Sequence, residues 1–152
     1  MNKKAIAFLL VLSGNALACE GISLNLHFAS KHFGDAQGYE FNESSPGIGL
    51  SCNKVGYSYT AGVYKNSYYK QTFYAGMTSN THINRYKIGV AYGLASGYDD
   101  IRGNVNSVVP YGFITAGFKL NRTYSVNVLY APYSLVLQDS VDVLTAMLEV
   151  KF

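Results

Sequence analysis

The stretch YKIGVAYGLA, from Tyr86 to Ala95, decides the fold, because every second residue is large and apolar while the residues between are small or polar. A period of two is that of a β-strand whose two faces meet different surroundings. The same alternation closes the chain in LTAMLEVKF, from Leu144 to Phe152. Each stretch has one wholly apolar face, so the sequence predicts an all-β protein.

The alternation recurs in eight segments along the body of the chain. The segments are Ile22–Lys31, Gly47–Cys52, Val55–Asn66, Lys70–Thr78, Arg85–Gly97, Ser107–Phe118, Arg122–Ala131 and Val141–Phe152. Most of them have the length of about nine to twelve residues that suits a tilted membrane-crossing strand, whereas soluble strands commonly have about five or six.

Aromatic residues support a membrane setting for these strands. Tyrosines gather near the ends of the apolar faces, where a membrane barrel carries its aromatic girdles. They are Tyr57, Tyr59, Tyr86, Tyr92, Tyr124 and Tyr130. The final Phe152 closes an amphipathic strand and resembles the C-terminal signature of bacterial outer-membrane barrels. We therefore predict an eight-stranded antiparallel outer-membrane β-barrel, with a soluble β-domain as the alternative.

The first eighteen residues have the features of an export signal. Lys3 and Lys4 precede an apolar run, and the segment ends on Ala16-Leu17-Ala18. We expect cleavage after Ala18, which leaves residues 19–152 as one barrel domain in the bacterial outer membrane. That domain has ten Lys and Arg against nine Asp and Glu, so nucleic-acid binding has no electrostatic basis.

Cleavage after Ala18 makes Cys19 the first mature residue, and Cys52 is the other cysteine. Two cysteines in an exported chain favour a disulfide; lipidation of Cys19 is the alternative. If the N-terminus is periplasmic, short turns at Asn53–Lys54, Ser79–Asn84 and Lys119–Asn121 face the periplasm. The longer connections then face out, at His32–Ser45, Ser67–Tyr69, Tyr98–Asn106 and Pro132–Ser140. This arrangement places both cysteines at the periplasmic end.

Small residues occupy many of the positions that we expect to face the barrel interior. They are Gly47, Gly49, Gly62, Gly76, Gly89, Ala91, Gly93, Ala95 and Gly112. Side chains normally just fill an eight-stranded barrel, so a small lining predicts a pocket that would admit an extended acyl chain. The alternative is that glycine relieves strain where the barrel curves tightly. Few charges are expected to point inward, which argues against an aqueous pore.

Several short motifs, in order along the chain, resemble a known family. They are Ser30-Lys31-His32, Phe41-Asn42-Glu43, Pro46-Gly47-Ile48-Gly49-Leu50-Ser51, Tyr64-Lys65-Asn66-Ser67-Tyr68, Pro110 and Leu129-Tyr130-Ala131-Pro132. Their order and spacing resemble the PagP family of outer-membrane lipid A palmitoyltransferases. The resemblance covers nearly the whole mature chain, but the family's N-terminal amphipathic helix is missing.

The resemblance implies a catalytic set at the outer mouth. The family's histidine matches His32, its serine matches Ser67, and its aspartate is replaced by Asn66. An amide can orient a histidine but cannot stabilise its cation as a carboxylate does. His27 is the competing base because its position in the strand points inward. A polar interfacial role without catalysis is the alternative for both histidines.

Two prolines suggest how a lipid would enter. Pro110 and Pro132 lie near the outer ends of neighbouring strands, and neither has a backbone N–H to donate to the ladder. We expect a lateral gate between these strands, as the resemblance also implies. Ordinary strand termination is the alternative.

The resemblance implies an enzyme that moves an acyl chain from a phospholipid to lipid A or a similar outer-leaflet acceptor, and we expect it to be a monomer. Its partners are membrane lipids, and neither a metal nor a cofactor is implied, because the histidines lack the neighbours of a metal site. The alternatives are a non-catalytic barrel of the surface-binding or phage-exclusion type and a lipid A deacylase or phospholipid hydrolase.

Overall fold

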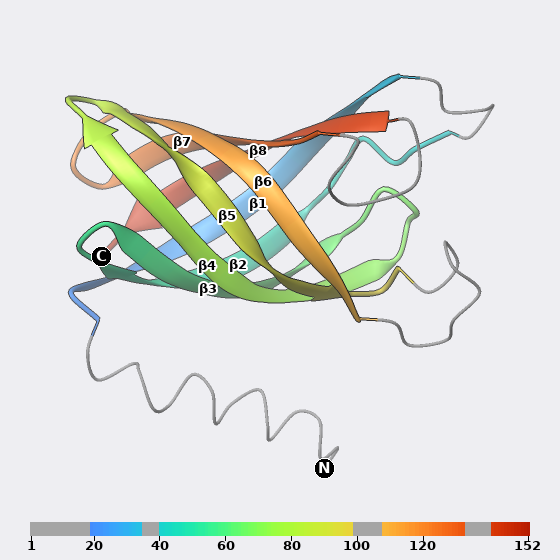
Figure 1. Cartoon of the computed structure of the whole chain (residues 1–152), viewed down its shortest axis with the longest axis horizontal. Helices are drawn as coiled ribbons and strands as arrows, with labels where there is room; N and C mark the ends of the chain where they lie inside the picture. Colours follow the sequence, from blue (N-terminus) through green and yellow to red (C-terminus); the bar gives the residue numbers. More distant parts are fainter. Residues whose placement is uncertain (1–18, 35–39, 99–107, 133–140) are drawn as a thin grey trace, which may run out of the picture.

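The computed structural model describes residues 19–34, 40–98, 108–132 and 141–152, and the predicted signal at residues 1–18 lies outside them. Within these residues, eight antiparallel strands close into a barrel (Figure 1). The strands are β1 Gly21–Gly34, β2 Gly47–Lys54, β3 Tyr57–Lys65, β4 Gln71–Ile83, β5 Tyr86–Ser96, β6 Val108–Lys119, β7 Tyr124–Ala131 and β8 Val141–Lys151. The predicted fold class is confirmed.

Each strand pairs with its neighbours in chain order, and β8 returns to β1 to close the ring. Leu24 of β1 lies opposite Leu50 of β2 on one side and opposite Val150 of β8 on the other. Closure gives every strand a neighbour on both sides, which a membrane requires because lipid cannot satisfy backbone groups.

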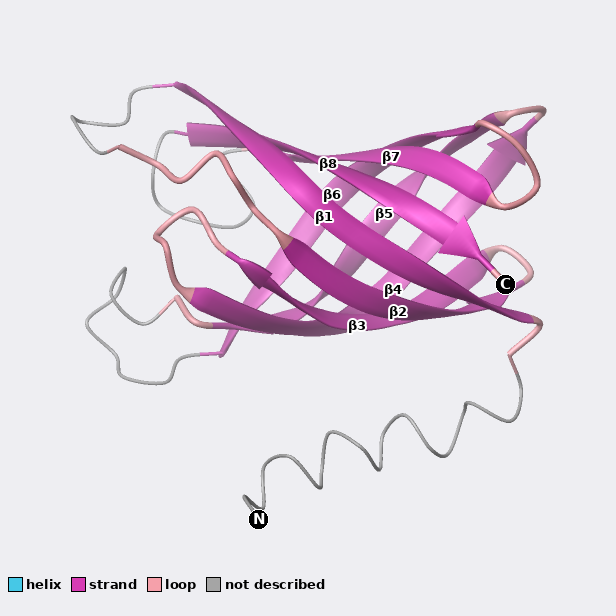
Figure 2. Cartoon of the chain, turned by 180° about the vertical axis from the view of Figure 1, so that it is seen from behind, coloured by secondary structure: helices cyan, strands magenta, loops and turns pink. Residues whose placement is uncertain are grey.

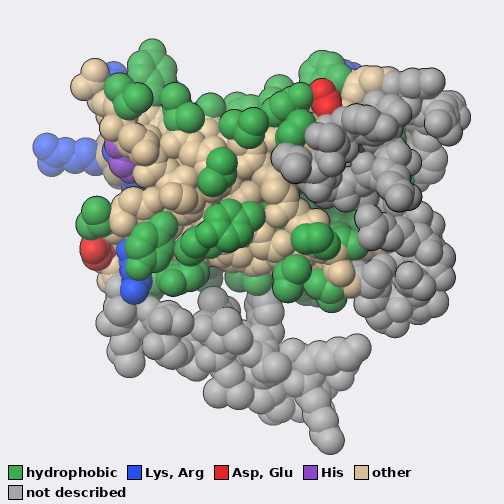
Figure 3. Space-filling model, in the orientation of Figure 1, with side chains coloured by type: hydrophobic (Ala, Val, Ile, Leu, Met, Phe, Trp, Pro, Cys, Tyr) green, Lys and Arg blue, Asp and Glu red, His purple; other side chains and the backbone are tan. Residues whose placement is uncertain are grey.

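The outer surface of the barrel is apolar. Side chains on this face are about half exposed, for example Ile48, Leu50, Ile88, Leu94 and Ile114. In the view of Figure 3, hydrophobic side chains are spread along the wall among backbone and other side chains, and most of the visible Lys, Arg and His side chains lie at the end with the tight turns. An apolar band between polar ends is the surface that a bilayer core solvates.

No helix in the described part of the chain is long and apolar enough to cross a membrane.

The tight turns lie at one end of the barrel, beside the C-terminus (Figure 2). Two of them differ from the predicted turns at Asn53–Lys54 and Ser79–Asn84. The β2–β3 turn is Val55–Gly56, with Gly56 at φ 79°, and the β4–β5 turn is Asn84–Arg85, with Asn84 at φ 57°. Both positive φ values suit tight hairpin turns, for which Gly and Asn are favoured. The expected outward loops at Tyr98–Asn106 and Pro132–Ser140 lie almost wholly outside the described residues.

Cys19 and Cys52 form a disulfide at the end with the tight turns, with their Cα atoms 5.2 Å apart. The bond ties the residues just before β1 to β2. Cys52 lies in β2, where it is opposite Ile22 of β1. The predicted disulfide is confirmed.

A β-bulge lies in the middle of β1. His27 is opposite Met147 of β8, whereas Ala29 is opposite Ala146, so Phe28 is an extra residue in this strand. An extra residue exchanges the two faces of the strand beyond it. The strand also continues to Gly34, past the expected end at Lys31. As a result His27 and His32, five positions apart, both face the interior and line the same cavity.

Candidate functional site at the outer mouth

His32 and Ser67 meet at the end of the barrel opposite the tight turns. His32 Nε2 lies 2.6 Å from Ser67 Oγ, although β1 and the segment after β3 are far apart in sequence. The His32 ring stacks on Phe41, with ring centroids 4.5 Å apart and planes 14° from parallel. The structure therefore brings together the predicted histidine and serine, and Phe41 fixes the plane of the imidazole.

The segment Glu40–Pro46 holds this pair in place. The backbone N–H of Ser30 donates to Glu43 O at 2.8 Å, so the segment pairs with the outer end of β1. On its other side, the N–H of Asn42 donates to Ser67 O at 2.9 Å, and Asn42 Nδ2 donates to Asn66 O at 3.1 Å. Sequence analysis used Phe41 and Asn42 only as part of a motif; their contacts show that they position the pair.

Asn66 does not contact His32, which corrects the prediction that it orients the histidine. Its amide Nδ2 donates to Thr72 Oγ1 at 3.1 Å and to Gly97 O at 2.8 Å. Its Oδ1 accepts the backbone N–H groups of Tyr68 and Lys70, both at 2.9 Å. Asn66 is 1% exposed and all of its hydrogen-bonding capacity is used. It organises the turn that carries Ser67.

The second nitrogen of the histidine is not oriented by a carboxylate. His32 Nδ1 is buried and has no hydrogen-bond partner among the described residues. Glu43 is near, but its carboxylate lies 2.7 Å from Lys31 Nζ on the outer side of β1. The hydrogen bond from Lys31 lowers the pKa of Glu43, so this carboxylate is ionised and engaged at neutral pH. Among the described residues, the site is a His–Ser pair without an acidic third member of a triad.

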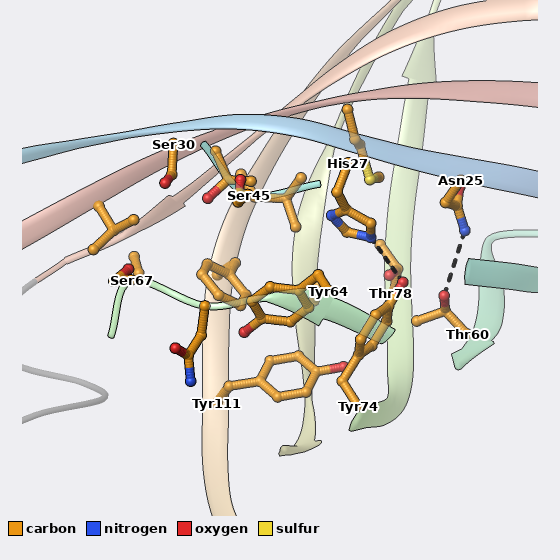
Figure 4. A pocket seen from close by; sticks show the side chains of 18 of the residues that line it. Asn25, His27, Ser30, Ser45, Thr60, Tyr64, Ser67, Tyr74, Thr78 and Tyr111 are labelled. Carbon is orange, nitrogen blue, oxygen red and sulfur yellow. Dashed lines mark hydrogen bonds between the residues drawn. The ribbon is translucent and has the colours of Figure 1, made fainter. Parts of the chain in front are cut away.

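Below the pair, a cavity of about 150 Å³ runs into the barrel, and His32, Ser67, Phe41 and Pro132 lie at its mouth. Figure 4 shows Ser67 and Ser30 toward one side of this cavity and His27, Asn25 and Thr60 toward the other. Within the described residues, no group of three His, Cys, Asp or Glu side chains is placed to hold a metal ion.

The glycines do not line this cavity, because tyrosine rings lie on them. A Cβ added at Gly49 would meet Tyr74 Oη, one at Gly62 would lie 2.8 Å from Tyr74 Cε1, and one at Gly93 would lie 2.7 Å from Tyr111 Oη. Of the residues expected to line an acyl pocket, Ala91 alone is in the cavity wall. The same close approaches hold at the other inward glycines, Gly47, Gly76 and Gly89, where a Cβ would collide with neighbouring backbone or side chains.

Gly112 is a further correction, because it faces outward. It lies opposite Tyr92 of the outer surface, and a Cβ added to it would meet nothing within 4 Å. Its neighbours Tyr111 and Phe113 are the inward residues of β6 and line the cavity.

Tyrosines fill the outer half of the interior, which sequence analysis did not foresee. Tyr64 Oη lies 2.7 Å from Tyr98 Oη, and the Tyr74 and Tyr111 rings meet edge to face at 6.5 Å. The sequence does contain a pattern that could have predicted this packing: tyrosines and glycines both occupy inward positions on neighbouring strands. A large ring on one strand needs a small residue beside it on the next strand.

His27, the competing base, lies deeper in the same cavity. Its Nε2 is 2.9 Å from Tyr74 Oη, and its ring stacks on Tyr64 at 5.7 Å between centroids. The dashed line in Figure 4 marks the bond to Tyr74. His27 therefore belongs to the tyrosine cluster and does not contact the His32–Ser67 pair.

The predicted gate region lies beyond the last described pair of β6 and β7. The outermost pair between them in the described residues is Ile114 with Tyr130, so the segment 108–113 of β6 has no described partner on β7. Pro110 lies in this segment and pairs with Leu94 of β5, while Pro132 follows the end of β7. Lipid passage at this point stays a prediction.

No protein-family model matches the chain, and no curated protein matches it. Among solved structures, a barrel described under "De novo design of transmembrane beta-barrels" superposes with a TM-score of 0.60 and 10% identity over 87% of this chain and 95% of that chain. The crystal structure of Neisserial surface protein A (NspA) matches with a TM-score of 0.46 and 16% identity over 87% of this chain and 97% of that chain.

The likeness to the designed barrels is one of fold. It agrees with the closed eight-stranded ring, the apolar outer face and the polar ends. The chain is a small transmembrane β-barrel of the outer-membrane type.

Proposed function

We propose that this barrel is an outer-membrane enzyme that transfers an acyl chain from a phospholipid to lipid A or a similar outer-leaflet acceptor. The observation that carries the proposal is the 2.6 Å contact between His32 Nε2 and Ser67 Oγ at the mouth of the interior cavity. A base within hydrogen-bond distance of a hydroxyl is the minimum that acyl transfer needs.

The pair supports a two-step reaction. His32 Nε2 takes the proton of Ser67, whose oxygen attacks the ester carbonyl of the donor; the ester bond breaks, and the leaving oxygen receives the proton from His32. The acceptor hydroxyl then gives its proton to His32 and attacks the acyl-serine, which restores Ser67. His32 serves as base and then as acid in each step.

The surroundings of the pair suit a lipid substrate. The pair lies at the end of the barrel where the phospholipid and the acceptor would meet, and the cavity below it is lined at the top by Phe41, Leu129, Val141 and Val143. The described pairing of β6 with β7 ends at Ile114 and Tyr130, and an opening beyond that pair, beside Pro110, would let an acyl tail enter from the bilayer. The reaction needs no cofactor.

Mass spectrometry of lipid A tests the proposal in cells that produce the wild-type chain, the Ser67→Ala variant or neither. We expect a lipid A species heavier by one acyl chain with the wild type alone. Loss of an acyl chain would support the deacylase reading, in which water replaces the acceptor. An unchanged lipid A and phospholipid profile with a folded barrel would contradict both enzyme readings.

A second candidate is a non-catalytic barrel that binds a partner at the cell surface. Two observations favour it: His32 Nδ1 has no partner among the described residues, and the tyrosines occupy much of the space that an acyl chain would need. In that case His32 and Phe41 only stiffen the mouth, and His32→Ala would leave membrane lipids unchanged.

A further inference from the structure

A buried ion pair crosses the interior toward the end with the tight turns. Lys87 Nζ of β5 lies 2.7 Å from Glu149 Oε2 of β8, and the two side chains are 13% and 6% exposed. β5 and β8 are not neighbours in the ring, so the pair spans the lumen. The sequence predicts few inward charges, and Lys87 and Glu149 are two of them.

Glu149 is also held by residues of β1, β7 and its own strand β8. Ser23 Oγ of β1 donates to Oε1 at 3.1 Å, and Asn127 Nδ2 of β7 donates to Oε2 at 3.1 Å. Lys151 Nζ lies 3.8 Å from Oε1. Lys87, in contrast, has one charged contact among the described residues, which is the one with Glu149. The carboxylate is the fixed side of the pair and the lysine arm is its movable side.

The pair separates two hollows. The cavity below His32 reaches down to Ser58, Asn80, Lys87 and Glu149. A second hollow of about 390 Å³ opens from these same four residues toward the end with the tight turns. The ion pair therefore stands where the two hollows meet.

The lining above the pair is polar and suits water. Below the tyrosines, the cavity wall is formed by Asn25, Ser51, Thr60, Thr78 and Asn80. These hydroxyl and amide groups bond partly to one another, as Asn25 Nδ2 does to Ser51 Oγ at 2.7 Å, and their remaining donors and acceptors can bond to water, whereas an acyl chain would leave that remaining capacity unused. Any acyl chain in the cavity is therefore confined to its outer part.

We propose that the lumen is a narrow water path for small ions and that the Lys87–Glu149 pair is the gate that closes it. Swinging the Lys87 side chain away from Glu149 joins the outer cavity to the hollow below, and both charged groups then meet water instead of each other. This function is independent of the reaction at His32 and Ser67, which lie at the opposite end of the cavity.

The test measures ion conductance of the full mature barrel in planar bilayers in potassium chloride. The variants are Lys87→Gln, Glu149→Gln and the milder Glu149→Asp, which keeps the charge but shortens the arm. The matched control is Lys31→Gln, which breaks another Lys–Glu pair with a 2.7 Å contact, Lys31 with Glu43, on the exposed outer end.

We expect rare openings in the wild type, an open probability at least tenfold higher in Lys87→Gln and Glu149→Gln, a smaller rise in Glu149→Asp, and no change in the control. Equal conductance in the wild type and in folded Lys87→Gln and Glu149→Gln barrels would overturn the proposal, as would an equal rise in the control. If neither of those two variants folds, unchanged conductance in Glu149→Asp overturns it.

Discussion

The two histidines of β1 form the same kind of contact in two different places. His27 bonds a tyrosine hydroxyl at 2.9 Å between two aromatic rings, and His32 bonds a serine hydroxyl at 2.6 Å at the mouth. Each has a hydroxyl partner, yet one is enclosed by the packing of the barrel and the other meets the opening. A histidine–hydroxyl bond therefore does not define a reactive site; its access to substrate does.

The distinction between the two histidines fails if the pair at the mouth, His32 and Ser67, is not catalytic. We expect His32→Ala and Ser67→Ala each to slow acyl transfer by about a hundredfold to ten-thousandfold, because general base catalysis and the nucleophile are both lost. The double variant should be no slower than either single variant, since the two residues act as one unit. Transfer is measured by lipid mass spectrometry, with the gel shift on boiling as the control for folding. Full activity in His32→Ala with loss in His27→Ala would identify His27 as the base. His27 and Tyr74 form the deep pair of the cavity.

The deep pair should show its role in stability instead. We expect His27→Ala to lower the free energy of unfolding by about 3 kcal/mol, because a packed ring and its bond to Tyr74 are both lost. Urea unfolding in lipid vesicles measures this, with Tyr74→Phe as a control that removes only the hydroxyl and should cost about 1 kcal/mol. A His27→Ala barrel of wild-type stability would contradict the structural role.

Asn66→Asp tests whether the turn below Ser67 needs an amide. The carboxylate would face Gly97 O, which now accepts from Nδ2 at 2.8 Å, so we expect a loss of about 2 kcal/mol and slower transfer. Asn121→Asp is the matched control, because Asn121 Oδ1 only accepts, from Thr123 and Tyr124 N–H, and a carboxylate can do the same. If Asn66→Asp preserves stability and raises activity, the residue acts as a weakened acid of the family type.

The smallest expected effect concerns Gly62, against which the Tyr74 ring of the deep pair packs. Gly62→Ala places a Cβ 2.8 Å from Tyr74 Cε1 and against the backbone of β2, so we expect a cost of about 1 kcal/mol or more and a weaker His27 contact. Gly112→Ala, where the Cβ meets nothing, should stay within about 0.5 kcal/mol of the wild type. Unfolding of both variants under the same conditions decides the matter; equal stability would contradict the seating of Tyr74.

Strand alternation predicted the closed barrel because burial of one face leaves a signal in every strand. The disulfide followed from the same logic, since chain direction alone places Cys19 and Cys52 at one end. The ion pair was not predicted: alternation puts Lys87 and Glu149 on the inner face, but their meeting depends on closure across strands that are not neighbours. Contacts across a closed ring leave no local pattern.

The site was predicted less completely for two physical reasons. The inner glycines suggested empty space, whereas the tyrosines that fill it come from neighbouring strands, as Tyr74 does over Gly62. Asn66 was matched to an acidic residue by its position beside Ser67, although its side chain turns toward Thr72 and Gly97. Side-chain direction in a turn is set by local hydrogen bonds, which position in the sequence does not reveal.

The bulge at Phe28 has a consequence for how relatives of this chain would diverge. Deleting that one residue would make the pairs of His27 with Met147 and of Ala29 with Ala146 consecutive in an unbroken ladder, so Ser30 and His32 would still face the interior. Relatives could therefore gain or lose one codon here without exchanging the inner and outer side chains. An ungapped alignment of one relative that has the bulge with another that lacks it would instead compare residues on opposite faces of the wall.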